Sequence, residues 1–138
     1  MKTTLAAVQS SISQFLRAHK RELAGIDFVV GVSRGGLIPA ALIATAMDKP
    51  LVTAYIDRQD NVYLDRADWI KRKRLLLVDD IVRTGSTFAK MHAMLERHDP
   101  KSIQSFTLFC LRGASIRPTW SHMVAKDRVM PWDMKRRH

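Results

Sequence analysis

The 138-residue sequence has one cysteine, few aromatic residues and a shortage of acidic side chains. Cys110 has no partner for an internal disulfide, and its place in the apolar run 106–111 predicts a small buried hydrophobe in a reducing, cytoplasmic setting. No apolar stretch approaches the roughly 20 residues of a membrane span, and the N-terminus lacks a signal-peptide core. Neither a membrane partner nor export is therefore expected. The length favours a single domain over residues 1–138.

The shortage of acids leaves a formal net charge of +10, from 23 Lys and Arg against 13 Asp and Glu. Such a charge attracts either a small anionic substrate or nucleic acid, unless it is only a solvated surface. The basic residues are scattered, apart from runs at 71–74 and 135–137, and no aromatic interleaving or nucleic-acid-binding motif accompanies them. The charge therefore indicates an anionic partner, of which nucleic acid is not the favoured one.

Helical and strand patterns alternate along the chain. Residues 57–72 interrupt them as a polar, charged excursion that we expect to be exposed and partly β. The alternation predicts an α/β fold, with a mostly parallel twisted sheet flanked by helices and ligands bound beyond the carboxyl ends of the strands. The expected helices are 4–19, 37–47 and a segment from Phe88 to about Asp99, and the expected strands are 26–32, 51–56, 74–79 and 103–111.

A glycine loop, Ser33-Arg34-Gly35-Gly36, connects the first predicted strand to a helix. Its glycines let the backbone approach a ligand closely, and its amides can point at an anion. Arg34 adds a guanidinium that fits phosphate, whereas an ordinary tight turn would explain the glycines alone. Residues 31–35 also match the Gly-x-Ser-x-Gly elbow of hydrolases, but the chain is short for that fold and its histidines are poorly placed for a triad.

The most specific pattern is the strand that ends at Asp79 and Asp80 and leads into a phosphate turn, Arg83-Thr84-Gly85-Ser86-Thr87. Two adjacent carboxylates after a buried strand are costly unless they meet water, a cation or ligand hydroxyls. Hydroxyls, a glycine and free amides at a helix N-terminus suit a phosphate. The combination favours a ribose 5-phosphate over the alternative, in which the acids cap the following helix.

Residues 78–87 resemble the signature of type I phosphoribosyltransferases, which bind phosphoribosyl pyrophosphate (PRPP). Residues 32–40 look like the pyrophosphate loop of the bacterial xanthine-guanine branch, and residues 131–134 look like its purine-side segment, so the likeness covers about 26–134. It implies the type I fold with a small or reduced hood. It also implies Mg2+-dependent transfer of a 5-phosphoribosyl group to guanine, xanthine or hypoxanthine with release of pyrophosphate, by a dimer or tetramer.

The resemblance implies a role for individual residues as well. Arg34, Asp79 and Asp80 are the expected catalytic residues, and Asp80 is the expected metal ligand. The expected binding residues are Ser33, Arg34, Gly35 and Gly36 for pyrophosphate; Asp79, Asp80, Arg83, Thr84, Gly85, Ser86 and Thr87 for ribose 5-phosphate; and Arg112, Val129, Trp132 and Asp133 for the base.

Two longer segments also receive roles from the resemblance. The excursion at about 57–72 would be a flexible lid that excludes water from a ribosyl cation-like transition state. Tyr63, Arg58 or Arg66 would reach the pyrophosphate from this lid. A base-side segment at about 111–138 would complete the acceptor pocket.

Three positions depart from the purine pattern. Arg83 stands where that branch has an aspartate near the base nitrogen, and a guanidinium does not act as a general base at neutral pH. Asp127 stands where an aromatic residue stacks on the base. Leu111 stands where a lysine contacts the purine oxygen, which leaves the adjacent Arg112 as its substitute.

These departures leave three alternatives open. Another group takes the proton, the base arrives already anionic, or purine transfer is slow or absent. The chain also stops five residues after Asp133, without the C-terminal arm of many relatives. Two further functions therefore stand beside purine transfer: a nucleotide-sensing, RNA-binding regulator with the same fold, and phosphoribosyl transfer to a non-purine acceptor.

Overall fold

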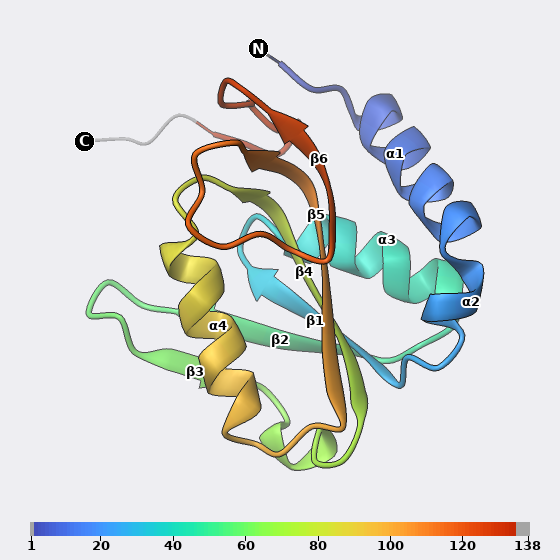
Figure 1. Ribbon diagram of the computed structural model, residues 1–138, viewed down its shortest axis with the longest axis vertical. Helices are drawn as coiled ribbons and strands as arrows, with labels where there is room; N and C mark the ends of the chain where they lie inside the picture. Colours follow the sequence, from blue (N-terminus) through green and yellow to red (C-terminus); the bar gives the residue numbers. More distant parts are fainter. Residues whose placement is uncertain (1, 135–138) are drawn as a thin grey trace.

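A six-stranded sheet forms the centre of the protein, which the computed structural model describes for residues 2–134 (Figure 1). The strand order is β3-β2-β1-β4-β5-β6, and β3 alone runs antiparallel to its neighbour. The predicted α/β fold is confirmed. The elements are α1 (Leu5–Ala18), α2 (Lys20–Leu23), β1 (Phe28–Ser33), α3 (Leu37–Met47), β2 (Leu51–Ile56), β3 (Val62–Leu64), the 3-10 turn η1 (Ala67–Trp69), β4 (Arg74–Val82), α4 (Ser86–Glu96), β5 (Ser102–Leu111) and β6 (Trp120–Val124).

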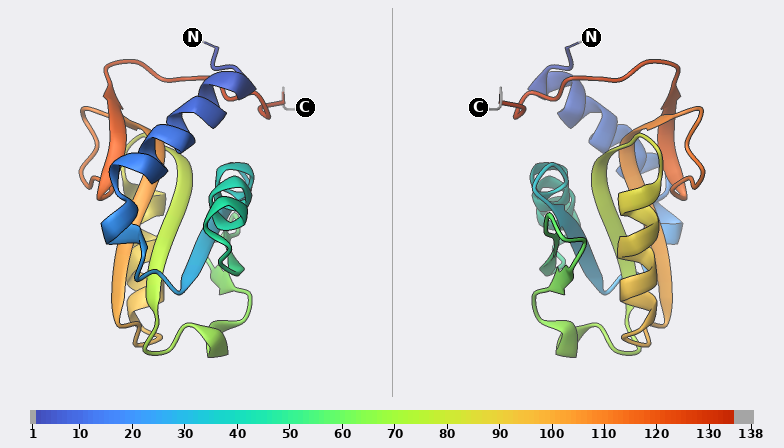
Figure 2. Two further views of the ribbon diagram at one scale, coloured as in Figure 1. Left: turned by 90° about the vertical axis from the view of Figure 1, so that its right-hand side faces the viewer. Right: turned by 90° about the vertical axis from the view of Figure 1, so that its left-hand side faces the viewer.

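Helices cover both faces of the sheet (Figure 2). α1 and α3 pack on one face, where Val29 and Leu76 belong to the same core, and α4 packs on the other face with Val30 and Leu77. Because successive residues of a strand point to opposite faces, β1 and β4 must be apolar on both. This explains their nearly continuous hydrophobic sequences. None of the helices in residues 2–134 is long and apolar enough to cross a membrane.

The central strand β4 is longer than the sequence predicts. The predicted strand ends at Asp79, but β4 continues through Asp80 to Val82. The continuation pairs with β5, with Asp79 opposite Thr107 and Val82 opposite Cys110. Both carboxylates therefore lie inside a hydrogen-bonded strand and do not follow its end, so the ladder fixes their backbone.

Three short elements were not predicted, namely α2, η1 and β6. The parallel strand β6 depends on long-range contacts that a weak local alternation does not reveal. The Ser105 amide donates to Thr119 Oγ1 at 3.0 Å, and the Thr119 amide donates to Ser105 Oγ at 2.9 Å. This reciprocal pair places the start of β6 against β5.

Candidate active site

The carboxyl ends of β1 and β2 open into a cleft of about 890 Å3. This is the edge of a parallel sheet where ligands usually bind. The glycine loop, the end of β2 and the C-terminal segment surround it. The lining residues are Ser33, Arg34, Gly35, Ile38, Tyr55, Ile56, Asp57, Arg58, Trp132, Asp133 and Met134.

The glycine loop packs directly against the Asp80 carboxylate and the backbone of β4. A Cβ atom on Gly35 would overlap the Asp80 carboxylate. A Cβ atom on Gly36 would lie 2.6 Å from the Val78 carbonyl oxygen and 2.8 Å from Asp79 Cα. Only glycine permits this approach, so the glycine loop and the carboxylate-bearing end of β4, which are distant in the sequence, lie in direct contact.

The carboxylates are held by the backbone of their own strand. The Asp80 amide donates to Asp79 Oδ1 at 2.8 Å, and the Ile81 amide donates to Asp80 Oδ1 at 2.7 Å. Burial, together with the neighbouring Asp80 charge, raises the pKa of Asp79 well above its usual range. Trp132 Nε1 donates to Asp80 Oδ2 at 3.4 Å, which connects this oxygen to a side chain that lines the cleft, although Asp80 itself does not line it. Neither carboxylate caps α4 in these bonds, contrary to the capping alternative.

The phosphate turn is shaped by Gly85, which has a φ of 98° at the N-cap of α4. A Cβ atom there would also lie 2.6 Å from Ile116 Cγ2. Thr84 Oγ1 accepts from the Ser86 amide at 3.2 Å, and the Thr84 carbonyl accepts from the Ser115 amide at 2.8 Å. Because glycine supplies no side-chain cap, the amides of the first turn of α4 after that of Ser86 are left for an anion.

Two of the three departures from the purine pattern contact each other. Arg83 Nε donates to Asp127 Oδ1 at 3.0 Å and to Oδ2 at 2.9 Å. Partial burial alone would raise the pKa of Asp127, but the bonds from Arg83 and the Arg128 amide outweigh it and lower the pKa. About half of each side chain is exposed. The sequence identified both residues as unusual and did not indicate that they pair.

The predicted base-side residues are divided between the cleft and its surroundings. Trp132 and Asp133 line the cleft, and Asp133 Oδ2 accepts from the Met130 amide at 2.7 Å. The Val129 carbonyl already accepts from the Thr3 amide at 2.8 Å. Arg112 is exposed just beyond β5 and is not among the cleft residues.

The excursion at 57–72 is partly β, as predicted, because β3 pairs with β2 as a hairpin. Of the three lid candidates, Arg58 lines the cleft. The Tyr63 hydroxyl donates to Asp57 Oδ2 at 3.2 Å, and the Arg66 guanidinium lies 4.4 Å from the centre of the Trp69 ring. The assignment of a flexible lid stays a prediction.

Sequence reasoning missed the contribution of β2 to the cleft. Tyr55, Ile56 and Asp57 line it, although we attached no role to this strand end. Only their position in the sequence could have indicated this role, because the carboxyl end of a parallel strand next to β1 lies at the same edge of the sheet as the glycine loop. Hydrogen bonds, the largest effect coming from the Asn61 amide, lower the pKa of Asp57.

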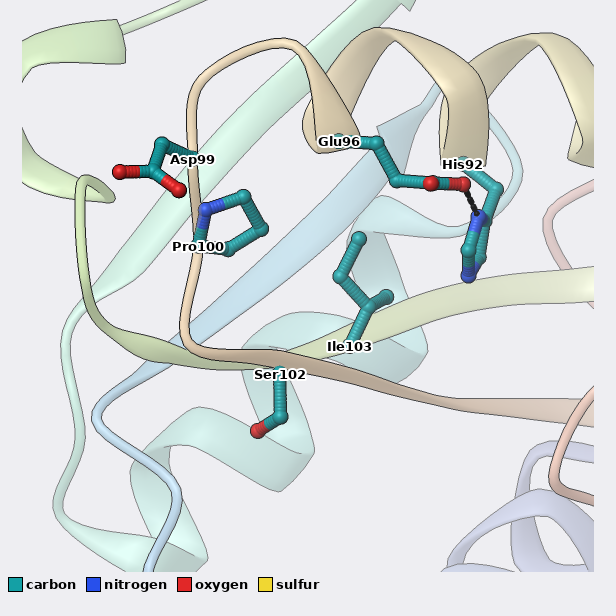
Figure 3. Close-up of a pocket in the computed structure, with 6 residues that line it drawn as sticks. All are labelled: His92, Glu96, Asp99, Pro100, Ser102 and Ile103. Carbon is teal, nitrogen blue, oxygen red and sulfur yellow. Dashed lines mark hydrogen bonds and ion pairs between the residues drawn. The ribbon is translucent and has the colours of Figure 1, made fainter.

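A smaller pocket of about 300 Å3 lies near the C-terminal end of α4 (Figure 3). His92 Nδ1 and Glu96 Oε1 form a 2.7 Å contact at its rim. None of the residues with a predicted role lines it. It is therefore separate from the candidate active site. Its lining residues are His92, Glu96, Asp99, Pro100, Ser102 and Ile103.

Comparisons with known proteins agree with this geometry. A phosphoribosyl transferase domain matches residues 5–135. A xanthine-guanine phosphoribosyltransferase of Chromohalobacter salexigens is 38% identical over 135 residues, covering 86% of this chain and 77% of that protein. The solved purine phosphoribosyltransferase of Pyrococcus horikoshii superimposes with a TM-score of 0.85 at 25% identity, over 100% of this chain and 97% of that one.

One relative carries a different description. The transcriptional regulator GfcR of Methanocorpusculum labreanum is 27% identical over 117 residues, or 80% of this chain, and the chain spans 59% of its length. The fold, the paired loops and the matches define a phosphoribosyltransferase domain. The chain belongs to the phosphoribosyl transferase domain family, and the resemblance to its xanthine-guanine branch is confirmed.

Proposed function

We propose that the protein transfers a 5-phosphoribosyl group from PRPP to guanine, xanthine or hypoxanthine, with release of pyrophosphate. The observation that carries this proposal is the contact of the glycine loop with Asp79 and Asp80. That contact joins a cationic, amide-rich loop to a carboxylate pair, and the phosphate turn follows the pair within the same stretch of chain. The activities named for the bacterial and archaeal relatives support the same reaction.

The donor would lie across these parts according to charge. Ser33, Arg34 and the two glycine amides would bind the pyrophosphate, and Arg34 would stabilise the charge that grows on it as it leaves. Asp79 and Asp80 would accept hydrogen bonds from the ribose hydroxyls. The phosphate turn would bind the 5-phosphate through its amides and hydroxyls.

The carboxylates also fit a magnesium ion. Mg2+ prefers oxygen ligands and is usually bound by one or two carboxylates together with substrate phosphates. Asp80 Oδ2 is the more available protein oxygen, because its contact with Trp132 Nε1 is 3.4 Å long, whereas Oδ1 accepts from the Ile81 amide at 2.7 Å. No group of three or more His, Cys, Asp or Glu side chains that could hold a metal ion occurs in residues 2–134. When bound, Mg2+ would neutralise charge on the departing pyrophosphate.

The acceptor base would enter from the side of the C-terminal segment. Trp132 and Asp133 line the cleft there, and we assign Val129 and Arg112 to the outer part of the same pocket. Closure of the lid at 57–72 would exclude water. We also propose a cytoplasmic location. The protein would form a dimer or tetramer, and light scattering would measure this oligomeric state.

A base screen tests the acceptor class. We expect the wild-type protein to release pyrophosphate with at least one of the three purines and not with orotate or uracil. Arg83→Asp supplies a carboxylate beside the acceptor, so kcat with neutral purines should rise about tenfold or more, even if loss of the Asp127 contact raises KM. Turnover with a pyrimidine or an amine alone, unchanged in Arg83→Asp, would instead identify a non-purine acceptor.

A second candidate function is a nucleotide-sensing regulator that binds RNA. Two observations favour it: the similarity to a transcriptional regulator, and the exposed basic run 71–74 at the amino end of β4. RNA binding with a steep salt dependence, together with no pyrophosphate release from any base, would support this function over transfer.

A further inference from the structure

An exposed ion pair joins two parts of the site that are 44 residues apart in the sequence. Arg83 begins the phosphate turn, and Asp127 lies beyond β6 in a base-side strap, which we define as residues 125–133. Arg83 Nε bonds both carboxylate oxygens of Asp127, at 3.0 and 2.9 Å. The pair therefore connects the segment assigned to the donor phosphate with the segment assigned to the base.

The Arg83 guanidinium also lies in the field of the site carboxylates. Partial burial alone would lower its pKa, but Asp127 first, and then Asp80 and Asp133, raise it. Both hydrogen bonds of the side chain use Nε. A cation in this position attracts the strap toward the edge of the sheet where Asp80 lies.

The later part of the strap is anchored in the core, where Met130 is buried and Trp132 packs, whereas residues 125–127 are exposed. The Val129 carbonyl accepts from the Thr3 amide at 2.8 Å, and Trp132 Nε1 reaches Asp80 Oδ2 at the longer distance of 3.4 Å. Within residues 2–134, the Arg83–Asp127 pair is the one salt bridge between the strap and the phosphate turn. The pair therefore joins the exposed Asp127 end of the strap to that side of the site.

We propose that Arg83 and Asp127 are positioning residues for the acceptor, and that their ion pair sets the affinity of the site for the purine base. The proposal rests on the proposed function, since it assigns the strap to the base. The sheet holds the backbone of the donor residues Arg34, Asp79 and Asp80, which lie in or beside β1 and β4, and the strap reaches Asp80 through the long 3.4 Å contact of Trp132 Nε1. Loss of the pair should therefore weaken base binding without weakening donor binding.

Asp127→Asn removes the charge and leaves the shape of the side chain. We expect KM for the purine base to rise about fivefold, which corresponds to about 1 kcal/mol, the upper end for an exposed ion pair, while KM for PRPP changes less than about twofold. Asp127→Glu keeps the charge and should stay within about threefold of wild type for the base. Because exposed ion pairs contribute little to stability, thermal unfolding should be nearly unchanged.

Glu96→Gln is the matched control, because it removes a carboxylate from another partly exposed pair, His92–Glu96, away from the candidate active site (Figure 3). Both KM values should match wild type in this control. The double variant Arg83→Asp with Asp127→Arg reverses the pair and should restore KM for the base to within about threefold. The proposal would be overturned if Asp127→Asn changed KM for the base and KM for PRPP equally. It would also be overturned if KM for the base in the double variant were as high as in Asp127→Asn.

A measurement without turnover separates this proposal from the proposed function. Acrylamide quenching of Trp132 fluorescence, obtained by subtracting the signal of Trp132→Phe, reports how closely the strap packs. Quenching should increase in Asp127→Asn and return to the wild-type value in Asp127→Glu. If wild type shows no transferase activity but quenching follows this pattern, the proposed function fails and the strap contact stands. Quenching that is unchanged in Asp127→Asn would refute the positioning role.

Discussion

Asp80→Asn should abolish Mg2+-dependent binding of PRPP and lower kcat/KM by about a hundredfold or more. The change keeps the side-chain volume and the Oδ1 atom that accepts from the Ile81 amide, so the strand should be undisturbed. It removes the negative charge at the oxygen that faces Gly35 and Trp132. A neutral amide binds a hard dication weakly, so the protein would no longer hold the Mg2+ ion that the donor's phosphate oxygens share. Titration calorimetry and initial-rate kinetics measure the two effects.

Asp48→Asn is the matched control for this change. Asp48 is exposed and has a φ of 53°, a left-handed conformation that asparagine also tolerates. The control should bind PRPP like wild type. If Asp80→Asn also binds normally in the presence of Mg2+, the carboxylate pair has no role in donor binding.

Gly36→Ala should destabilise the protein by about 3 kcal/mol, which is the upper end of the usual range for overpacking. Its Cβ atom would meet backbone on three sides: the carbonyl oxygens of Val78 and Val32, at 2.6 and 2.8 Å, and Asp79 Cα at 2.8 Å. Backbone inside a paired sheet has little freedom to move. Separation of the glycine loop from β4 should also weaken PRPP binding. Urea denaturation measures the free energy of unfolding.

Two other glycines calibrate this prediction. No atom lies within 4 Å of a Cβ built on Gly113, so Gly113→Ala should leave the free energy of unfolding nearly unchanged. Gly35→Ala would meet the Asp80 side chain, which can rotate, so it should cost less stability than Gly36→Ala while still disturbing the carboxylate. Equal stabilities for the Gly36 and Gly113 variants would contradict the close contact between the loops.

Local patterns predicted most of the fold because they arise from burial within single elements. β1 and β4 are apolar on both faces, and α4 presents Phe88 and Met91 at helical spacing. β6 escaped prediction because its position depends on the pairing of Thr119 with Ser105 across a loop. The end of β4 was placed too early because the two acids looked like the start of a loop.

The candidate site was predictable where chemistry is carried by contiguous residues, as in the glycine loop and the phosphate turn. Two features of the candidate site could not be predicted from the sequence. The contact of the glycine loop with Asp80 and the pairing of Arg83 with Asp127 join residues that are distant in the chain. A single sequence holds no signal for such contacts, so Arg83 and Asp127 appeared as two unrelated departures when they form one ion pair.

Calorimetric titration of PRPP into the wild-type protein tests the central claim most directly. With Mg2+ present, we expect saturable binding at one site per chain, and we expect it to be lost with EDTA and in Asp80→Asn. Absence of saturable binding to the folded wild-type protein with Mg2+ would contradict the assignment of the glycine loop, the carboxylate pair and the phosphate turn to a phosphoribosyl donor.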